Sequence, residues 1–199
     1  RRGRRFPAPG AAGRGGDASS RPGIGPPQPR GSTVDPLTYL LGLERLGIKF
    51  GLDNVRAVCE ALDNPQRSWP SAIIAGTNGK GSVAAMVEAG LRAAGCRTGL
   101  YTSPHLIRIE ERFAIDGQAV DTLRLIDAAA RVQAVVGRLR SDGRLATEPT
   151  FFEVTTAIGF ELFRRAGVDF AVLEVGLGGR FDATNVATPV AGAITTIDF

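Results

Sequence analysis

Apolar runs and amphipathic stretches take turns along most of this chain, and their order predicts alternating strands and helices. Short apolar runs bounded by turn residues predict strands at 71–75, 97–103, 168–176 and 189–197. Helical spacing predicts a helix that starts at Pro36, after a candidate cap at Asp35, and further helices at 53–63, 82–94, 121–140 and 150–167. These elements predict a three-layer α/β/α domain with a mostly parallel sheet.

Composition divides the chain near residue 33. Residues 1–33 are rich in Gly, Pro and Arg and hold seven arginines and one aspartate, so the net charge of +4 becomes −2 for residues 34–199. Such a tail cannot bury enough apolar surface to fold, and we expect residues 1–33 to be disordered. It could be an organelle-targeting segment or an inert extension. Because the body has no excess of basic residues, no nucleic-acid partner is expected.

Two further properties limit the class of protein. The longest apolar runs are too short for a transmembrane helix, so no membrane partner is expected. The two cysteines, Cys59 and Cys96, lack the spacing of a metal site or a disulfide framework. Reduced thiols and the absence of a secretory signal favour a cytoplasmic protein.

A glycine-rich segment, "GTNGKGS" (76–82), joins a predicted strand to a predicted helix. Backbone N–H groups and the helix dipole can hold an anion there, glycines permit close approach, and a lysine can reach terminal phosphates. The spacing differs from the standard GxxxxGK[ST] pattern, and a tight turn with a surface lysine is the alternative. The predicted phosphate-binding residues are Thr77, Asn78, Gly79, Lys80, Gly81 and Ser82.

Two more predicted strands end in candidate site residues. Ser103, in "TSPHL", offers an oxygen, whereas His105 is the only histidine and is more often structural in such a position. Glu174 stands near the carboxyl end of the strand at 168–176, and a carboxylate near a phosphate loop is tolerated when a cation lies between them. Glu174 is therefore a candidate Mg²⁺ ligand. The alternative is a solvated carboxylate or one paired with Arg180.

The segment "TFFE" (150–153) starts a predicted helix. Thr150 could cap that helix, Phe151 and Phe152 could stack against a flat heterocycle, and Glu153 could accept hydrogen bonds from its amino groups. The alternative is that one phenylalanine belongs to the core and that Glu153 interacts only with the helix dipole.

Four blocks together resemble the folylpolyglutamate synthase/dihydrofolate synthase family of the Mur ligase superfamily: "GTNGKGS", "GLYTSPHLIRIEERFAIDG", "TFFEVTTAIGFELF" and "VLEVGLGGRFDATNV". The resemblance covers residues 35–199. It implies that residues 34–199 are the N-terminal part of a Mur-type ATP-binding domain with a P-loop-type nucleotide site. It also implies ATP and Mg²⁺ as cofactors, with Lys80 and Glu174 as catalytic residues and Ser103 and Glu174 as metal ligands. The implied pterin contacts are Thr150, Phe151, Phe152, Glu153, Phe181, Asp182 and Ala183, with the "FGLDN" segment (50–54) nearby.

The reaction implied by this resemblance is ATP-dependent amide formation by a monomeric enzyme. The carboxylate of dihydropteroate or folate attacks the γ-phosphate, and the amine of L-glutamate displaces phosphate from the resulting acyl phosphate. Positioning and charge neutralisation suffice for this chemistry, and no protein nucleophile is needed. Another Mur-type ligase, or a nucleotide- or pterin-binding module without catalysis, remains the alternative.

One departure from the family pattern concerns the end of the sequence, "AITTIDF". The family continues with a histidine that binds a second Mg²⁺, a carbamylated lysine and a smaller C-terminal domain. We therefore expect this chain to be an incomplete fragment with little or no ligase activity alone, and to expose an apolar sheet edge.

Overall fold

The computed structural model of this chain describes residues 34–46 and 51–198, so the predicted disorder of residues 1–33 lies outside the described part. The helices are α1 (Pro36–Gly42), α2 (Asp53–Ala61), α3 (Lys80–Ala93), α4 (Thr122–Ser141) and α5 (Phe151–Ala166). Short 3₁₀ helices are η1 (Leu43–Leu46), η2 (Pro65–Arg67), η3 (Ile109–Arg112) and η4 (Ala183–Val186). The strands are β1 (Ser71–Ala75), β2 (Thr98–Tyr101), β3 (Phe113–Ile115), β4 (Gln118–Ala119), β5 (Phe170–Glu174) and β6 (Ala191–Ile194).

The six strands form one sheet in the order β4-β3-β2-β5-β1-β6. Strands β2, β5, β1 and β6 are parallel, whereas β3 and β4 add an antiparallel hairpin at one side. Strand β5 lies between β1 and β2, with Ile74 opposite Glu174 and Tyr101 opposite Leu173. The loops after β1, β2 and β5 therefore leave the same edge of the sheet side by side, where α/β proteins usually build their sites.

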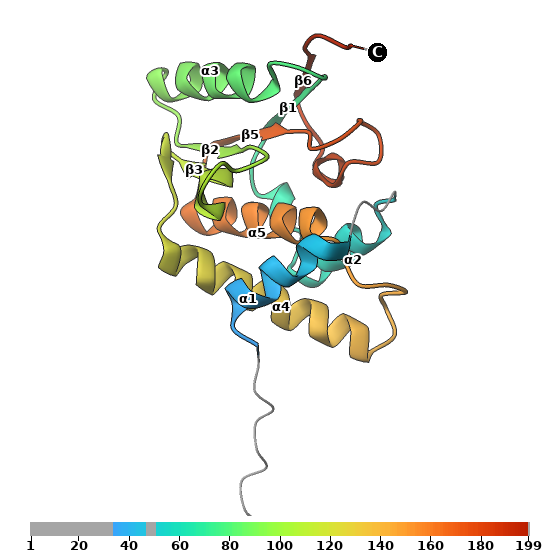
Figure 1. Cartoon of the computed structure of the whole chain (residues 1–199). Coiled ribbons are helices and arrows are strands. Elements are labelled where there is room, and N and C mark those ends of the chain that lie inside the picture. The colour runs from blue at the N-terminus through green and yellow to red at the C-terminus, as the bar shows by residue number, and fades with distance from the viewer. Residues whose placement is uncertain (1–33, 47–50, 199) are drawn as a thin grey trace, which may run out of the picture. The chain divides into compact units, whose positions relative to one another are not determined.

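Helices cover both faces of this sheet, as the sequence predicts. Figure 1 shows α3 on one face and α5 on the other, with α4 and α1 beyond α5. Helix α3 packs Ala84 against Ile74 and Val172, which forms a small apolar cluster. The α/β/α prediction is confirmed, and α1, α2 and α4 add a further helical layer outside α5.

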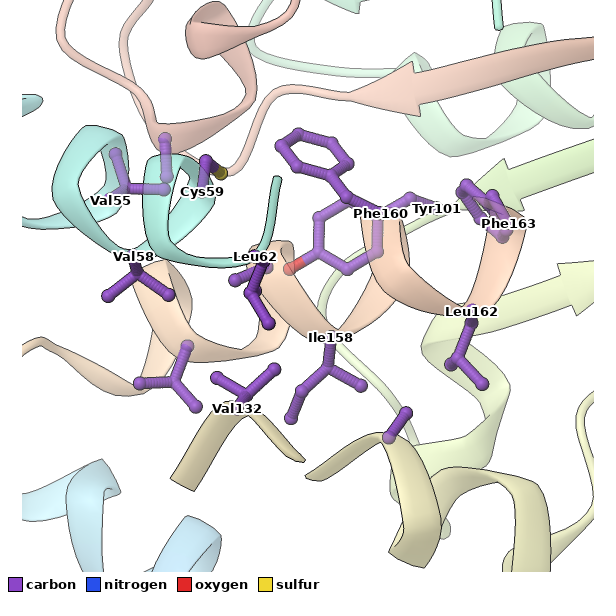
Figure 2. Close-up of a cluster of buried hydrophobic side chains, with 14 of the residues drawn as sticks. Val55, Val58, Cys59, Leu62, Tyr101, Val132, Ile158, Phe160, Leu162 and Phe163 are labelled. Atoms are coloured by element: carbon purple, nitrogen blue, oxygen red, sulfur yellow. The ribbon is translucent and has the colours of Figure 1, made fainter. Parts of the chain in front are cut away.

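The larger apolar core surrounds α5, because that helix is packed between the sheet and the outer helices. All of its residues from Glu153 to Phe163 are buried, including the polar residues Glu153, Thr155, Thr156 and Glu161. Figure 2 shows part of this core, with side chains from α2, α4 and α5 and Tyr101 from β2. Trp69 adds tilted and edge-on contacts to Phe160 and Phe163, at ring-centroid distances of 5.5 and 6.0 Å.

Several helix ends follow the sequence signals. Asp35 caps α1 by accepting a hydrogen bond from the Thr38 amide at 3.0 Å, and α5 ends at Gly167, whose φ of +63° is left-handed. Within the described residues, no helix is long and apolar enough to cross a membrane.

Candidate functional site

The predicted phosphate loop is a tight turn from β1 into α3. Gly76 and Gly79 have φ values of +133° and +78°, which favour glycine. A Cβ atom added at Gly76 would lie 2.0 Å from Thr195 Oγ1, so only glycine fits there. Helix α3 begins at Lys80, and the Lys80 ammonium donates to the Thr77 carbonyl at 3.2 Å. The turn therefore places the lysine at a helix N-terminus, the geometry that holds an anion.

Residues 195–198, which follow β6, form hydrogen bonds to this turn. The Thr77 amide donates to the Thr196 carbonyl at 2.8 Å. Thr195 Oγ1 donates to the Asn78 carbonyl at 2.6 Å, and the Asn78 side chain donates to the Asp198 carboxylate. The backbone groups of Thr77 and Asn78 thus define the shape of the loop, while Lys80, Gly81 and Ser82 occupy the first turn of α3.

Glu174 lies between the loops that follow β1 and β2. Its Oε2 atom accepts a hydrogen bond from the Ser103 amide at 2.9 Å. On its other side, an ideal Cβ built at Gly81 would lie 3.5 and 3.6 Å from its two carboxylate oxygens. The structure therefore brings the phosphate loop, Ser103 and Glu174 together. Glu174 is only 4% exposed, and no ion pair with Arg180 occurs among the described residues, so neither alternative for this carboxylate holds.

Burial raises the pKa of Glu174 above its ordinary value of 4.5. The Ser103 amide and the positive charge of Lys80 oppose this effect only in part. A bound cation would favour the ionised carboxylate, and Mg²⁺ typically takes one or two protein carboxylates with phosphate and water oxygens. No group of three Asp, Glu, His or Cys side chains in the described ranges could hold a metal. The single carboxylate of Glu174 beside the phosphate loop fits a magnesium ion that shares its coordination with a nucleotide.

A cavity of about 470 Å³ opens beside these residues. It joins the phosphate loop, the Ser103 loop and the predicted pterin segments, so groups far apart in the sequence share one space. Its lining consists of Gly51, Lys80, Ser103, Pro104, Arg112, Thr150, Phe152, Glu153 and the continuous segment 176–183.

Thr150 and Glu153 form the capping box of α5 and also line this cavity. Glu153 Oε2 accepts hydrogen bonds from the Thr150 amide at 2.8 Å and the Thr150 hydroxyl at 3.1 Å. Glu153 Oε1 is buried and has no partner in the part of the chain that the structure describes. A buried carboxylate oxygen without a donor is unusual, and a ligand that supplies one would satisfy it.

The two adjacent phenylalanines have different surroundings. Phe152 lines the cavity and packs tightly on the backbone of Gly176, where an added Cβ would lie 2.4 Å from its ring. Phe151 is absent from the lining and packs against the core, with the Arg112 guanidinium 5.1 Å from its ring centroid. Both rings also pack against the core. Phe152 is the one that lines the cavity, and the prediction that Phe151 contacts a ligand stays a prediction.

Asp182 organises the glycine-rich loop after β5. Its Oδ2 atom accepts from the amides of Gly176 and Leu177 at 2.9 and 3.0 Å. Its Oδ1 atom accepts from the Thr184 amide at 3.0 Å and the Thr184 hydroxyl at 2.6 Å. Both oxygens thus close the loop, and any contact to a ligand would be an additional one. Its neighbours in the lining differ, since Ala183 is buried and Phe181 is 58% exposed.

Sequence reasoning missed Arg112. This arginine is only 7% exposed, and its Nε donates to His105 Nδ1 at 2.8 Å. Both residues lie in the "GLYTSPHLIRIEERFAIDG" block, but nothing in that block indicates that their side chains meet, so only the folded chain reveals the pair. His105 therefore supports Arg112 from within the Ser103 loop.

The fold and the site define an α/β protein with a phosphate loop of the nucleotide-binding type. No family model matches the sequence. The chain is 41% identical over 162 residues to a probable bifunctional folylpolyglutamate synthase/dihydropteroate synthase of Haloferax volcanii, covering 81% of this chain and 19% of that protein. It is 39% identical over 194 residues to a dihydrofolate synthase/folylpolyglutamate synthase of Mycobacterium tuberculosis, covering 91% and 39%.

Solved structures agree. The folylpolyglutamate synthase of Thermotoga maritima matches with a TM-score of 0.75 and 39% identity, over 82% of this chain and 37% of that one. The M. tuberculosis folylpolyglutamate synthase complexed with ADP matches with a TM-score of 0.75 and 40% identity, over 83% of this chain and 38% of that one. A bifunctional folylpolyglutamate synthase/dihydrofolate synthase of Yersinia pestis, complexed with AMPPNP and Mn, matches with a TM-score of 0.69 and 40% identity, over 79% of this chain and 37% of that one.

The chain is a homologue of the folylpolyglutamate synthases and dihydrofolate synthases over most of its own length. It spans between 19% and 39% of the length of the two curated relatives.

Proposed function

We propose that this chain forms the ATP- and pterin-binding part of a ligase that adds L-glutamate to dihydropteroate or folate. The observation that carries this proposal is the position of Glu174. Its carboxylate touches the Ser103 amide and lies against Gly81 of the phosphate loop. The same three loops open into the cavity that Phe152 and Glu153 line.

At the phosphate loop, the amides of the first turn of α3 and the Lys80 ammonium bind the terminal phosphates of ATP. Ser103 and Glu174 hold Mg²⁺, which supplies charge neutralisation to the phosphates. Because this transfer needs positioning more than covalent help, Lys80 and Glu174 are the catalytic residues of this part of the site.

In the cavity, the ring of Phe152 stacks against the pterin. Glu153 Oε1, which lacks a donor within the described residues, accepts a hydrogen bond from a pterin amino group. Thr150, Phe181, Asp182 and Ala183 complete the walls. The far end of the acceptor then faces Lys80, where its carboxylate meets the γ-phosphate.

Two observations on the relatives support this function. Their names specify folylpolyglutamate and dihydrofolate synthesis, and their structures contain ADP or AMPPNP with Mn. We further propose that the protein is a cytoplasmic monomer with small-molecule partners and with neither a nucleic-acid nor a membrane partner. Folate carries a glutamate on the carboxyl group that is free in dihydropteroate, and both acceptors fit the proposal.

Calorimetric titration of the 199-residue chain with AMPPNP, with and without Mg²⁺, tests the nucleotide half. The wild type should bind more tightly with Mg²⁺. Lys80→Ala should weaken binding by about tenfold or more, because it removes a charge-assisted contact. Glu174→Gln should keep the metal-free affinity and lose the gain from Mg²⁺.

Glu60→Gln is the matched control for the carboxylate, since Glu60 is exposed and pairs only with Arg144 in the described residues. It should behave as the wild type. A wild type without a Mg²⁺-dependent gain, or a Glu174→Gln variant that keeps one, would contradict the proposed site.

A further inference from the structure

Arg112 is a buried cation with a fixed orientation. It ends η3, and its side chain lines the cavity although the residue is 7% exposed. One face of its guanidinium lies over Phe151, 5.1 Å from the ring centroid. Its Nε atom donates to His105 Nδ1 at 2.8 Å. Neither contact is to an acidic group, so both orient the guanidinium without neutralising its charge.

This charge has no ion-pair partner among the described residues. Buried charges are normally paired, because leaving one alone in a protein interior is costly. The chain follows that rule elsewhere, where the buried Glu161 carboxylate receives Arg131, Arg164 and Arg165. Arg112 does not form an ion pair with Glu174, although its charge acts to lower the pKa of that carboxyl. An unpaired, oriented guanidinium in a cavity indicates an anion that arrives with a ligand.

The location of Arg112 narrows the choice of anion. The cavity also contains Lys80 of the phosphate loop and Phe152 beside the buried Glu153. Nε is occupied by His105, which leaves the two terminal nitrogens for a ligand. A planar pair of N–H donors matches a carboxylate in bidentate geometry.

We propose that Arg112 binds the reacting carboxylate of the pteroate-type acceptor, and that His105 and Phe151 position its guanidinium. This inference rests on the proposed function. The guanidinium offsets the repulsion between the acceptor carboxylate and the triphosphate, and it aims a carboxylate oxygen at the γ-phosphate. Arg112 is thus a substrate-binding residue, and His105 and Phe151 are positioning residues.

Two ligands that differ only in the charge of the acceptor's carboxyl group test whether Arg112 binds that charge. The probes are 7,8-dihydropteroate and its uncharged carboxamide, titrated by calorimetry into the 199-residue chain. Arg112→Gln should weaken binding of the acid by about 10- to 100-fold, the effect of losing a hydrogen-bonded charge. Binding of the carboxamide should change by less than about threefold, which also shows that the variant is folded.

Arg108→Gln is the matched control. Its side chain is 65% exposed, lies four residues earlier and pairs with Glu110 outside the cavity. It removes the same charge and should preserve the preference for the acid. Equal losses for acid and carboxamide in Arg112→Gln would overturn the inference and assign Arg112 a structural role. Loss of the Mg²⁺-dependent gain in AMPPNP binding, with the acid preference intact, would instead make it a counterion of Glu174 and would also overturn it.

The positioning role of His105 has its own variants. Asn can place an acceptor oxygen near the site of Nδ1, whereas Leu removes the acceptor. His105→Asn should therefore retain the preference for the acid over the carboxamide, and His105→Leu should lose most of it. If both variants keep the preference, His105 does not position Arg112. A wild type that binds AMPPNP but neither pterin probe would refute the pterin half of the proposed function, and the inference with it.

Discussion

At the scale of single residues, the phosphate loop depends on Gly76. Its φ of +133° is strained for any other residue, and an added Cβ would meet Thr195 Oγ1 at 2.0 Å. Gly76→Ala should lower the free energy of unfolding by about 1–3 kcal/mol from backbone strain alone and should weaken nucleotide binding. Chemical denaturation and AMPPNP titration measure the two effects.

Gly90 in α3 provides the control for the Gly76→Ala substitution. An added Cβ there has no neighbour within 4 Å, and its φ is not left-handed. Gly90→Ala should therefore raise the free energy of unfolding by about 1 kcal/mol and leave nucleotide binding unchanged. If Gly76→Ala behaved in the same way, the close approach of the loop to Thr195 would not be required.

The residues predicted from the sequence are those whose position along the chain determines their place in the fold. Lys80 follows a strand and starts a helix, and Glu174 ends a parallel strand, so both had to reach the same sheet edge. Arg112 could not be predicted, because only packing on Phe151 and His105 buries it. The different surroundings of Phe151 and Phe152 are likewise set by tertiary packing, which the sequence pattern does not contain.

At the scale of elements, Glu110 joins the loop after β2 to the start of α4. Its Oε1 atom accepts from Arg108 at 3.0 Å and from the Thr122 hydroxyl at 2.6 Å. These donors lower the pKa of Glu110 from 4.5 to about 2. Since the folded value is the lower one, the carboxylate stabilises the fold above pH 4.5, and this contribution disappears as the pH falls towards 2.

Glu110→Gln should therefore lower the Tm at pH 7, and its difference from the wild type should shrink as the pH falls from 4.5 towards 2. Thermal unfolding across this range measures the difference. Glu60→Gln removes an exposed carboxylate paired with Arg144, and surface pairs contribute little. It should show a small difference at every pH. A deficit for Glu110→Gln that persisted near pH 2 would argue against the carboxylate as its source.

The order and type of the long elements followed from the sequence, but the hairpin β3–β4 was not predicted. Its strands have only three and two residues, too few for a clear alternating pattern. The signal was its turn, where Asp116 and Gly117 have φ values of +51° and +75°. Asp-Gly between short apolar runs is typical of a tight hairpin and could have revealed it. Leu123 in the first turn of α4 is 78% exposed although it is apolar, because the packed neighbours decide which residues of that turn are covered.

At the scale of the whole described body, the sheet has two unequal edges. Strand β4 is short, and short edge strands resist pairing with other chains. Strand β6 has four residues without charge or proline, all of them exposed. Ile194 in this strand is 71% exposed and Val190 just before it is 68% exposed. An open apolar edge of this kind is a site for strand pairing between molecules.

The chain should therefore associate through this edge as its concentration rises, and Ile194→Lys should reduce that association, because a lysine on an edge strand opposes pairing. Sedimentation velocity over a concentration series measures the effect. Leu123→Lys is the control, since Leu123 is as exposed as Ile194 but lies on α4 rather than at a sheet edge. If both substitutions reduced association equally, general surface hydrophobicity would be its cause. A reduction confined to Ile194→Lys identifies β6 as the edge through which the molecules pair.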